Sequence, residues 1–80
     1  MKYALHYYDT CPFCQRVLAV LPDLKVPVEK RNVMQNRDWA KQQAQATGRT
    51  TVPCLLITDD NGKETWLYES ADIIRYLKSL

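Results

Sequence analysis

The stretch Tyr7–Val17, YYDTCPFCQRV, places two cysteines three positions apart where the pattern of the chain changes. Before it, residues 2–8 (KYALHYY) are rich in β-forming residues, and Asp9-Thr10 then predicts a turn. After the first cysteine, the apolar positions recur at the spacing of one helix face: Cys14, Val17, Leu18 and Leu21. The pattern predicts a strand, a turn and a helix, with the cysteines at the start of the helix.

Size and composition indicate one small globular domain. Eighty residues predict a single domain, residues 1–80, near the smallest size at which one core is stable without metals or disulfides. The chain is 46% hydrophobic and has only two glycines, which fits a packed core. Its 11 basic and 9 acidic residues are dispersed, so no long basic run is present to bind nucleic acid.

The sequence has no feature of a membrane or secreted protein. It contains no run of about eighteen apolar residues, and its N-terminus lacks an apolar stretch of signal-peptide length. Three cysteines are an odd and low number, which fits a reducing compartment better than a secreted disulfide framework. We therefore expect a soluble cytoplasmic protein without a membrane partner.

The middle of the chain predicts a strand and a helix. Residues 25–33 (KVPVEKRNV) have a strand pattern, in which Pro27 marks the start of the strand or an edge position. Residues 36–48 predict a helix that ends at Gly48. Because its apolar stripe is thin, we expect this helix to lie on the surface.

The last third of the chain predicts a hairpin and a helix. Residues 52–58 and 63–69 have strand patterns and are joined by the turn signal DDNG at 59–62. Residues 70–80 predict a helix with Ser70 as its N-cap. The order is β-α-β-α-β-β-α, which predicts an α/β fold with a mixed sheet and helices on its faces.

The two cysteines are suited to thiol–disulfide exchange. At a helix start, Cys11 would face unsatisfied backbone N–H groups and the positive end of the helix dipole, which favour the reactive thiolate. Cys14, one turn later, would attack a mixed disulfide on Cys11 and release the partner as a thiol. A zinc site is the competing interpretation, but zinc prefers four ligands and only Cys54 and His6 remain. We expect no metal and interpret these last two residues as packing residues.

A second element, Thr51-Val52-Pro53, lies where a buried strand begins. Proline is uncommon within a central strand. The spacing alone favours an ordinary trans proline at the first residue of the strand. A cis bond would instead turn the Val52 backbone outward, free to pair with an extended peptide beside Cys11.

Three motifs together resemble those of glutaredoxins, which have the thioredoxin fold. CPFC (11–14) follows the first strand, TGRTTVP (47–53) precedes the third, and ESADIIRYL (69–77) opens the last helix. The closing segment is similar to the N-terminal domain of glutathione transferases and of the two-domain bacterial glutaredoxin. The resemblance extends from Lys2 to Leu80 and implies a thioredoxin-like (glutaredoxin) fold, with a mixed four-stranded sheet and helices on both faces.

The resemblance also implies a site for glutathione as co-substrate. Cys11 would be the nucleophile and Cys14 the resolving thiol, and the backbone before a cis Pro53 would pair with the cysteinyl part of glutathione. Glu69 would pair with the α-amine of the γ-glutamyl group, and Ser70 would offer helix N-terminal amides to its carboxylate. A plain helix cap beside a solvated carboxylate is the alternative for these two residues. The implied glutathione contacts are Tyr8, Pro12, Phe13, Thr51, Val52, Pro53, Glu69 and Ser70.

One position departs from the family pattern. Many glutaredoxins have a lysine three residues before the first cysteine, where it contacts the glycyl carboxylate of glutathione, but this chain has Tyr8. Another cation would have to replace that lysine. The sequence leaves four candidates open: Arg16, Arg37, Lys41 and Arg49.

The predicted function is that of a dithiol glutaredoxin, a glutathione-dependent thiol–disulfide oxidoreductase. It would reduce protein disulfides and glutathione mixed disulfides, with the glutathione reductase system acting indirectly. Two alternatives keep the fold. One is an electron donor reduced by a flavin reductase, which Tyr8 suggests. The other is a dimer that binds a [2Fe-2S] cluster through Cys11 and glutathione.

Overall fold

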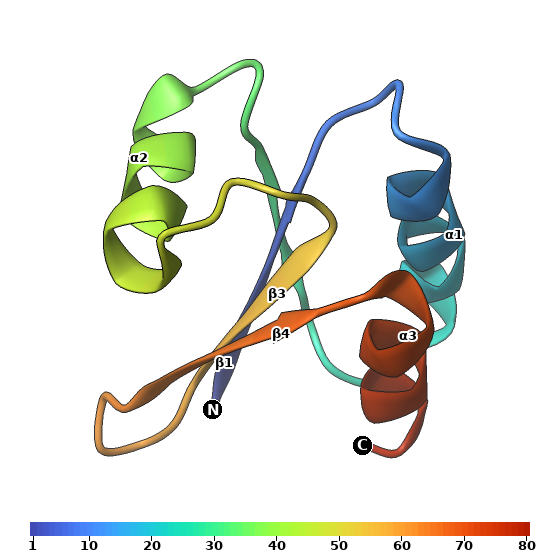
Figure 1. Cartoon of the computed structure of the whole chain (residues 1–80). Helices are drawn as coiled ribbons and strands as arrows, with labels where there is room; N and C mark the ends of the chain where they lie inside the picture. The colour runs from blue at the N-terminus through green and yellow to red at the C-terminus, as the bar shows by residue number, and fades with distance from the viewer.

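The elements follow one another in the predicted order β-α-β-α-β-β-α, with one short 3₁₀ turn added. The computed structural model describes all residues from Met1 to Leu80. Figure 1 shows α2 on one face of the sheet and α1 with α3 on the other, as the α/β prediction required. In chain order the elements are β1 (Lys2–Tyr7), α1 (Pro12–Val20), η1 (Leu21–Asp23), β2 (Glu29–Asn32), α2 (Arg37–Thr47), β3 (Cys54–Thr58), β4 (Glu64–Tyr68) and α3 (Ser70–Lys78).

The four strands form one mixed sheet in the order β2-β1-β3-β4. β1 and β2 are parallel, with Leu5 opposite Lys30, whereas β1–β3 and β3–β4 are antiparallel pairs. β1 and β4 therefore run in the same direction. Because α1 follows β1 and α3 follows β4, both helices begin at the end of the sheet where β3 starts, which is the C-terminal end of β1 and β4.

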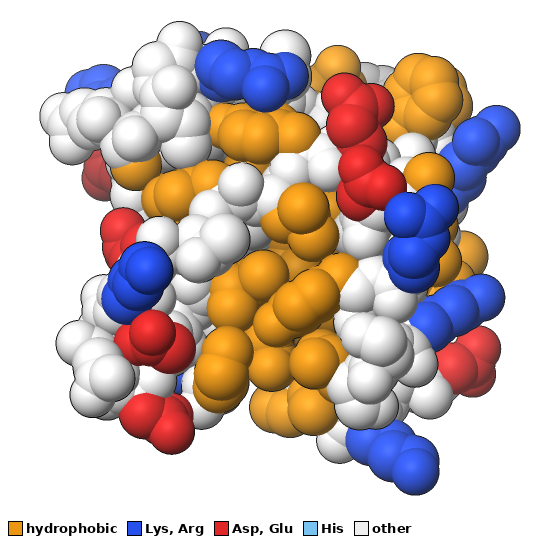
Figure 2. All heavy atoms as spheres, turned by 60° about the horizontal axis from the view of Figure 1, so that its bottom comes forward, with side chains coloured by type: hydrophobic (Ala, Val, Ile, Leu, Met, Phe, Trp, Pro, Cys, Tyr) orange, Lys and Arg blue, Asp and Glu red, His pale blue; other side chains and the backbone are white.

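The main core lies between the sheet and helices α1 and α3. Alternate residues of β1 and β3 face it, because successive side chains of a strand point to opposite faces. Its buried members are Leu5, Val17, Leu55, Ile57, Ile73 and Leu77. Figure 2 shows that other apolar side chains reach the surface as a band with charged side chains around it. A domain of this size has too little interior to bury all of them.

Two boundaries differ from the sequence-based predictions. β2 comprises only Glu29–Asn32 rather than residues 25–33, and as Pro27 suggested it is an edge strand that starts after the proline. Proline has no N–H to contribute to a ladder, so pairing with β1 begins beyond it. The prediction that Ser70 caps α3 is wrong by one residue. Glu69 holds the N-cap position, and Ser70 is the first helical residue.

The ends of α2 follow from local capping. The Asn36 side chain accepts a hydrogen bond from the backbone N–H of Asp38 at 3.0 Å and so starts the helix. Gly48 ends it in the left-handed conformation with φ 74°, as the glycine stop predicted. None of the three helices has the length and hydrophobicity needed to cross a bilayer.

We predict that Leu55→Ala lowers the free energy of unfolding by about 2–5 kcal/mol, because it leaves a cavity in the centre of the core. Leu55 is fully buried in β3, one of the two strands that are paired on both sides. Urea unfolding followed by circular dichroism would measure the change. Leu80→Ala is the matched control, since Leu80 is 45% exposed and its truncation should cost under about 1 kcal/mol. Equal losses for both variants would contradict this placement of the core.

Candidate functional site

Cys11 caps the first helix with its own sulfur. It occupies the N-cap of α1, and Pro12 follows it in the first turn. The Cys11 Sγ accepts a hydrogen bond from the backbone N–H of Cys14 at 3.3 Å. A sulfur in this position also lies at the positive end of the helix dipole. The sequence-based placement of Cys11 at the helix N-terminus is therefore confirmed.

Cys14 has a different environment although it lies only one turn away. Its side chain is fully buried, whereas Cys11 retains 6% of its accessible surface. Burial, together with smaller contributions from the hydrogen bond and charge at Cys11, raises the pKa of Cys14 to about 12. Both thiols are reduced in this structure. The pair therefore combines a capping sulfur in a residue that keeps a small exposed area with a fully buried, protonated thiol behind it.

The loop before β3 brings a backbone segment to Cys11. The Val52–Pro53 peptide bond is cis, as the family resemblance implied and as the spacing alone did not favour. The Cys11 Sγ lies 4.0 Å from the Val52 carbonyl oxygen. Val52 makes no backbone–backbone hydrogen bond. Its N–H is thus free to pair with an extended ligand beside the sulfur, and its carbonyl oxygen accepts only the long hydrogen bond from Cys11 Sγ.

The start of α3 forms the opposite wall. Glu69 has a positive φ of 71°, the one non-glycine residue of the chain with this conformation. Such a conformation costs energy for a residue with a side chain, and it is most often found at functional sites. The Glu69 side chain is exposed and neither caps the helix nor forms an ion pair. Glu69 and the N-terminal amides of α3 at Ser70 are available to a ligand.

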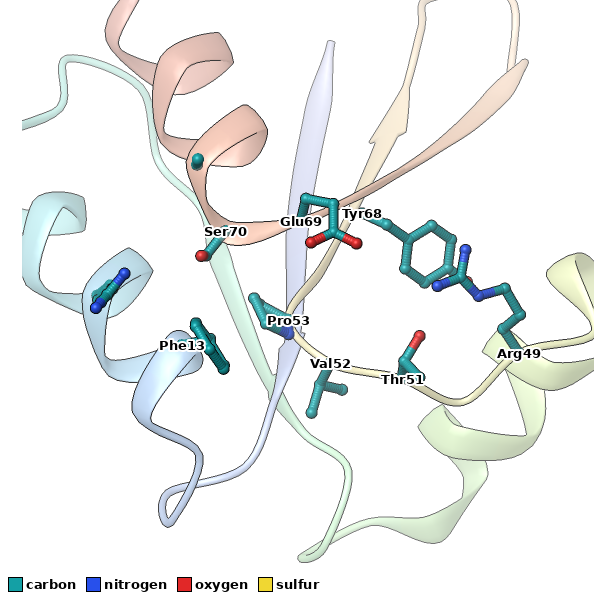
Figure 3. A pocket seen from close by; sticks show the side chains of 10 residues that line it. Phe13, Arg49, Thr51, Val52, Pro53, Tyr68, Glu69 and Ser70 are labelled. Atoms are coloured by element: carbon teal, nitrogen blue, oxygen red, sulfur yellow. The ribbon is translucent and has the colours of Figure 1, made fainter.

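The Val52 loop and the start of α3, with Phe13 of α1, line an open cavity of about 400 Å³, and Cys11 and Cys14 are not among its lining residues. Six of the eight predicted glutathione contacts line it, and Figure 3 shows them around a common space: Phe13, Thr51, Val52, Pro53, Glu69 and Ser70. Tyr8 and Pro12 are not among the lining residues. Tyr8 instead accepts a hydrogen bond from the Cys11 N–H through its carbonyl oxygen at 3.3 Å. The cavity therefore gathers residues from three distant parts of the chain.

Two of the four candidate cations line this cavity. The Arg49 guanidinium stacks on the Tyr68 ring, 4.1 Å from its centre, and it forms no ion pair (Figure 3). Arg16 lies at the other end, 5.4 Å from the centre of the Phe13 ring. The remaining two candidates do not line the cavity. Arg49 is thus a cation that is held in place by the Tyr68 ring and has no carboxylate partner of its own.

Sequence reasoning missed a polar cluster behind the cavity. Gln43 of α2 is fully buried, and its Nε2 donates to the Thr51 carbonyl oxygen at 2.8 Å. The Tyr68 hydroxyl donates to Thr47 Oγ1 at 2.7 Å. A signal was present in the sequence, because Gln43 stands four residues after the apolar Trp39 and therefore on the same face of the helix.

His6 and Cys54 are buried in the sheet under α2, as packing residues would be. Burial lowers the pKa of His6, and its Nε2 pairs with the Gln42 side chain at 3.3 Å. Burial raises the pKa of Cys54 to about 11. No three His, Cys, Asp or Glu side chains converge as metal ligands would.

Comparison with protein families relates the chain to one family. Residues 5–80 match the family described as Glutathione S-transferase, N-terminal domain. No curated protein sequence matches the chain significantly. The family comparison agrees with the resemblance seen in the closing ESADIIRYL segment.

Solved structures show the same relationship. A trimeric glutathione transferase from Leishmania, TDR1, has 28% identity and a TM-score of 0.74, over 96% of this chain and 17% of its own. An epsilon-class glutathione S-transferase from the housefly Musca domestica has 25% identity and a TM-score of 0.69, over 98% and 34%. Isozyme E7 from Drosophila melanogaster has 28% identity and a TM-score of 0.67, over 98% and 34%. The chain spans about a third or less of each of these proteins.

We predict that iodoacetamide alkylates Cys11 well before Cys14 or Cys54 in the reduced, folded protein at about neutral pH. The thiolate is the reactive form, and the raised pKa values of Cys14 (about 12) and Cys54 (about 11) keep both protonated. Peptide mass spectrometry over a time course would rank the three rates. The Cys11→Ser protein is the control and should show only slow labelling. Faster labelling of Cys14 than of Cys11 would contradict the proposed difference between the thiols.

Proposed function

The chain belongs to the glutathione S-transferase N-terminal domain family, and from this premise we propose that it is a glutathione-dependent thiol–disulfide oxidoreductase of the glutaredoxin type. The observation that carries the proposal is the pairing of Cys11, whose sulfur caps α1, with the buried Cys14 behind it. A sulfur stabilised by a helix N-terminus is a nucleophile, and a second thiol within one turn can complete an exchange cycle.

In the first reaction, the Cys11 thiolate attacks the glutathione sulfur of a mixed disulfide. A new S–S bond forms between Cys11 and glutathione, the original S–S bond breaks, and the released thiolate takes a proton from solvent. A second glutathione, as thiolate, then attacks the glutathione sulfur on Cys11. Oxidised glutathione leaves, so its disulfide carries the two-electron oxidation that the mixed disulfide has lost. Cys11 returns to its thiolate form.

Protein disulfides follow a dithiol route. Cys11 attacks one sulfur of the substrate and forms a mixed disulfide, and Cys14 then loses its proton and attacks Cys11. The substrate leaves as a dithiol, and the Cys11–Cys14 disulfide is reduced by two glutathione molecules. Because the pKa of Cys14 is raised to about 12, chiefly by burial, its attack is slow near neutral pH. Direct attack by glutathione on Cys11 should therefore dominate with small substrates.

Glutathione fits the cavity by chemical complementarity. The Val52 backbone, which makes no backbone–backbone hydrogen bond, would pair with the cysteinyl peptide of glutathione, and this pairing would place the glutathione sulfur near Cys11. The amides at Ser70 would hold the γ-glutamyl carboxylate, and the Glu69 carboxylate its α-amine. Arg49, which forms no ion pair, would bind the glycyl carboxylate of glutathione in place of the lysine that Tyr8 replaces. The protein would work in the cytoplasm, where glutathione reductase would recycle the oxidised product.

We predict that Cys11→Ser lowers glutathione-dependent reduction of a small glutathionylated disulfide at least about a hundredfold, because it removes the nucleophile. Cys14→Ser should retain this activity within about threefold but lose reduction of protein disulfides, which requires the second thiol. A coupled assay with glutathione, glutathione reductase and the nicotinamide cofactor would measure the first activity, and insulin reduction the second. Full activity of Cys11→Ser would sink the proposal.

We predict that Arg49→Gln raises the KM for glutathione about tenfold to a hundredfold with little change in kcat, because a charged hydrogen bond to a carboxylate is lost in both ground and transition states. Arg49→Lys should recover part of this loss. Arg37→Gln is the matched control, since Arg37 is an exposed arginine that does not line the cavity. A larger rise in the KM for glutathione in Arg37→Gln than in Arg49→Gln would indicate that Arg37 binds the carboxylate instead.

A further inference from the structure

Gln43 is an unusual residue for its position. It lies in the middle of α2 with no exposed surface, and glutamine is seldom fully buried. Burying its amide costs free energy that only hydrogen bonds can offset. One atom, Oε1, is buried and has no partner. An apolar side chain of similar volume would fill this space with a smaller desolvation penalty. The presence of an amide here therefore needs an explanation.

That reason lies in the loop that Gln43 holds. Residues 49–53 make no backbone–backbone hydrogen bond, although they carry the Val52 backbone and the cis proline. At one end, the Arg49 N–H donates to Thr47 Oγ1 at 3.0 Å. In the middle, Gln43 Nε2 donates to the Thr51 carbonyl oxygen at 2.8 Å. We call this second bond the tether: it holds Thr51, the residue immediately before Val52.

The tether is braced by the far edge of the sheet. Gln43 Nε2 also lies 3.4 Å from the Tyr68 hydroxyl, at the end of β4. That hydroxyl donates to Thr47 Oγ1, and Thr47 Oγ1 in turn donates to the Gln43 carbonyl oxygen at 2.9 Å. Tyr68 also carries the Arg49 guanidinium on its ring. One buried amide thus connects α2, β4 and the loop, and it fixes two walls of the cavity.

We propose that Gln43 is a positioning residue for glutathione: its amide holds the Thr51–Val52 backbone in the register that pairs with the cysteinyl peptide of the bound thiol. It does not touch the ligand and takes no part in the exchange at Cys11. The inference rests on the proposed function, because it names the step that Gln43 serves. Removal of the amide should weaken glutathione binding while the sulfur chemistry continues at its usual rate.

The test is Gln43→Met, which keeps the volume and removes the donor. The KM for glutathione should rise about tenfold, with kcat within about twofold of the wild type. Hydrogen exchange at the Arg49 amide, which donates to Thr47 Oγ1 at the start of the same loop, should accelerate, while exchange in the centre of β3 and alkylation of Cys11 by iodoacetamide stay unchanged. Gln45→Met is the matched control, because Gln45 is an exposed glutamine on the same helix.

The outcomes separate the two proposals. An unchanged KM in an active, folded Gln43→Met protein would overturn this inference alone, whereas a wild type without glutathione-dependent activity would overturn the proposed function and this inference with it. Where Gln43→Met fails to fold, Gln43→Glu replaces it. A protonated carboxyl can donate to the Thr51 carbonyl oxygen and an ionised one cannot, so its KM should rise with pH relative to the wild type. A parallel pH profile would overturn the inference.

Discussion

The direction of the strands determines where the site lies. β1 and β4 run parallel to each other because antiparallel β3 lies between them. Their C-terminal ends and the start of β3 therefore lie at the same end of the sheet. The last paired row across these strands is His6, Cys54 and Tyr68. Beyond that row the chain has to turn, into α1 after β1, out of the loop before β3, and into α3 after β4. The capping sulfur, the cis proline and the α3 N-terminus converge for this reason.

The two faces of the sheet have different physical characters. The face under α1 and α3 is an apolar core, whose packing supplies the stability of a small domain. The face under α2 contains buried polar groups, among them His6 Nδ1 and Gln43 Oε1, which have no hydrogen-bond partner. Such groups reduce stability. Proteins keep arrangements of this kind mainly where function requires them, and here Gln43 bonds to Thr51 and Tyr68, which line the cavity.

Much of the fold and part of the site follow from local sequence. The helix-face spacing after Cys11 and the DDNG turn predicted α1 and the β3–β4 hairpin, because hydrophobic periodicity and turn residues are signals that a short stretch of sequence carries. Capping is also local, but it depends on single dihedral angles. The prediction of Ser70 as the α3 cap was therefore wrong by one residue, since the positive φ of Glu69 carries no clear sequence signal.

The sequence by itself determined the order of the elements, the position of the cysteine pair at a helix start and the family that these motifs resemble. Only the tertiary structure decided that Arg49 rather than Arg37 faces the cavity, and that Gln43 is a buried tether. These features depend on contacts between residues far apart in the chain, such as Gln43 and Tyr68, which are 25 positions apart. Local periodicity does not specify such contacts, because they exist only once α2 has packed on the sheet.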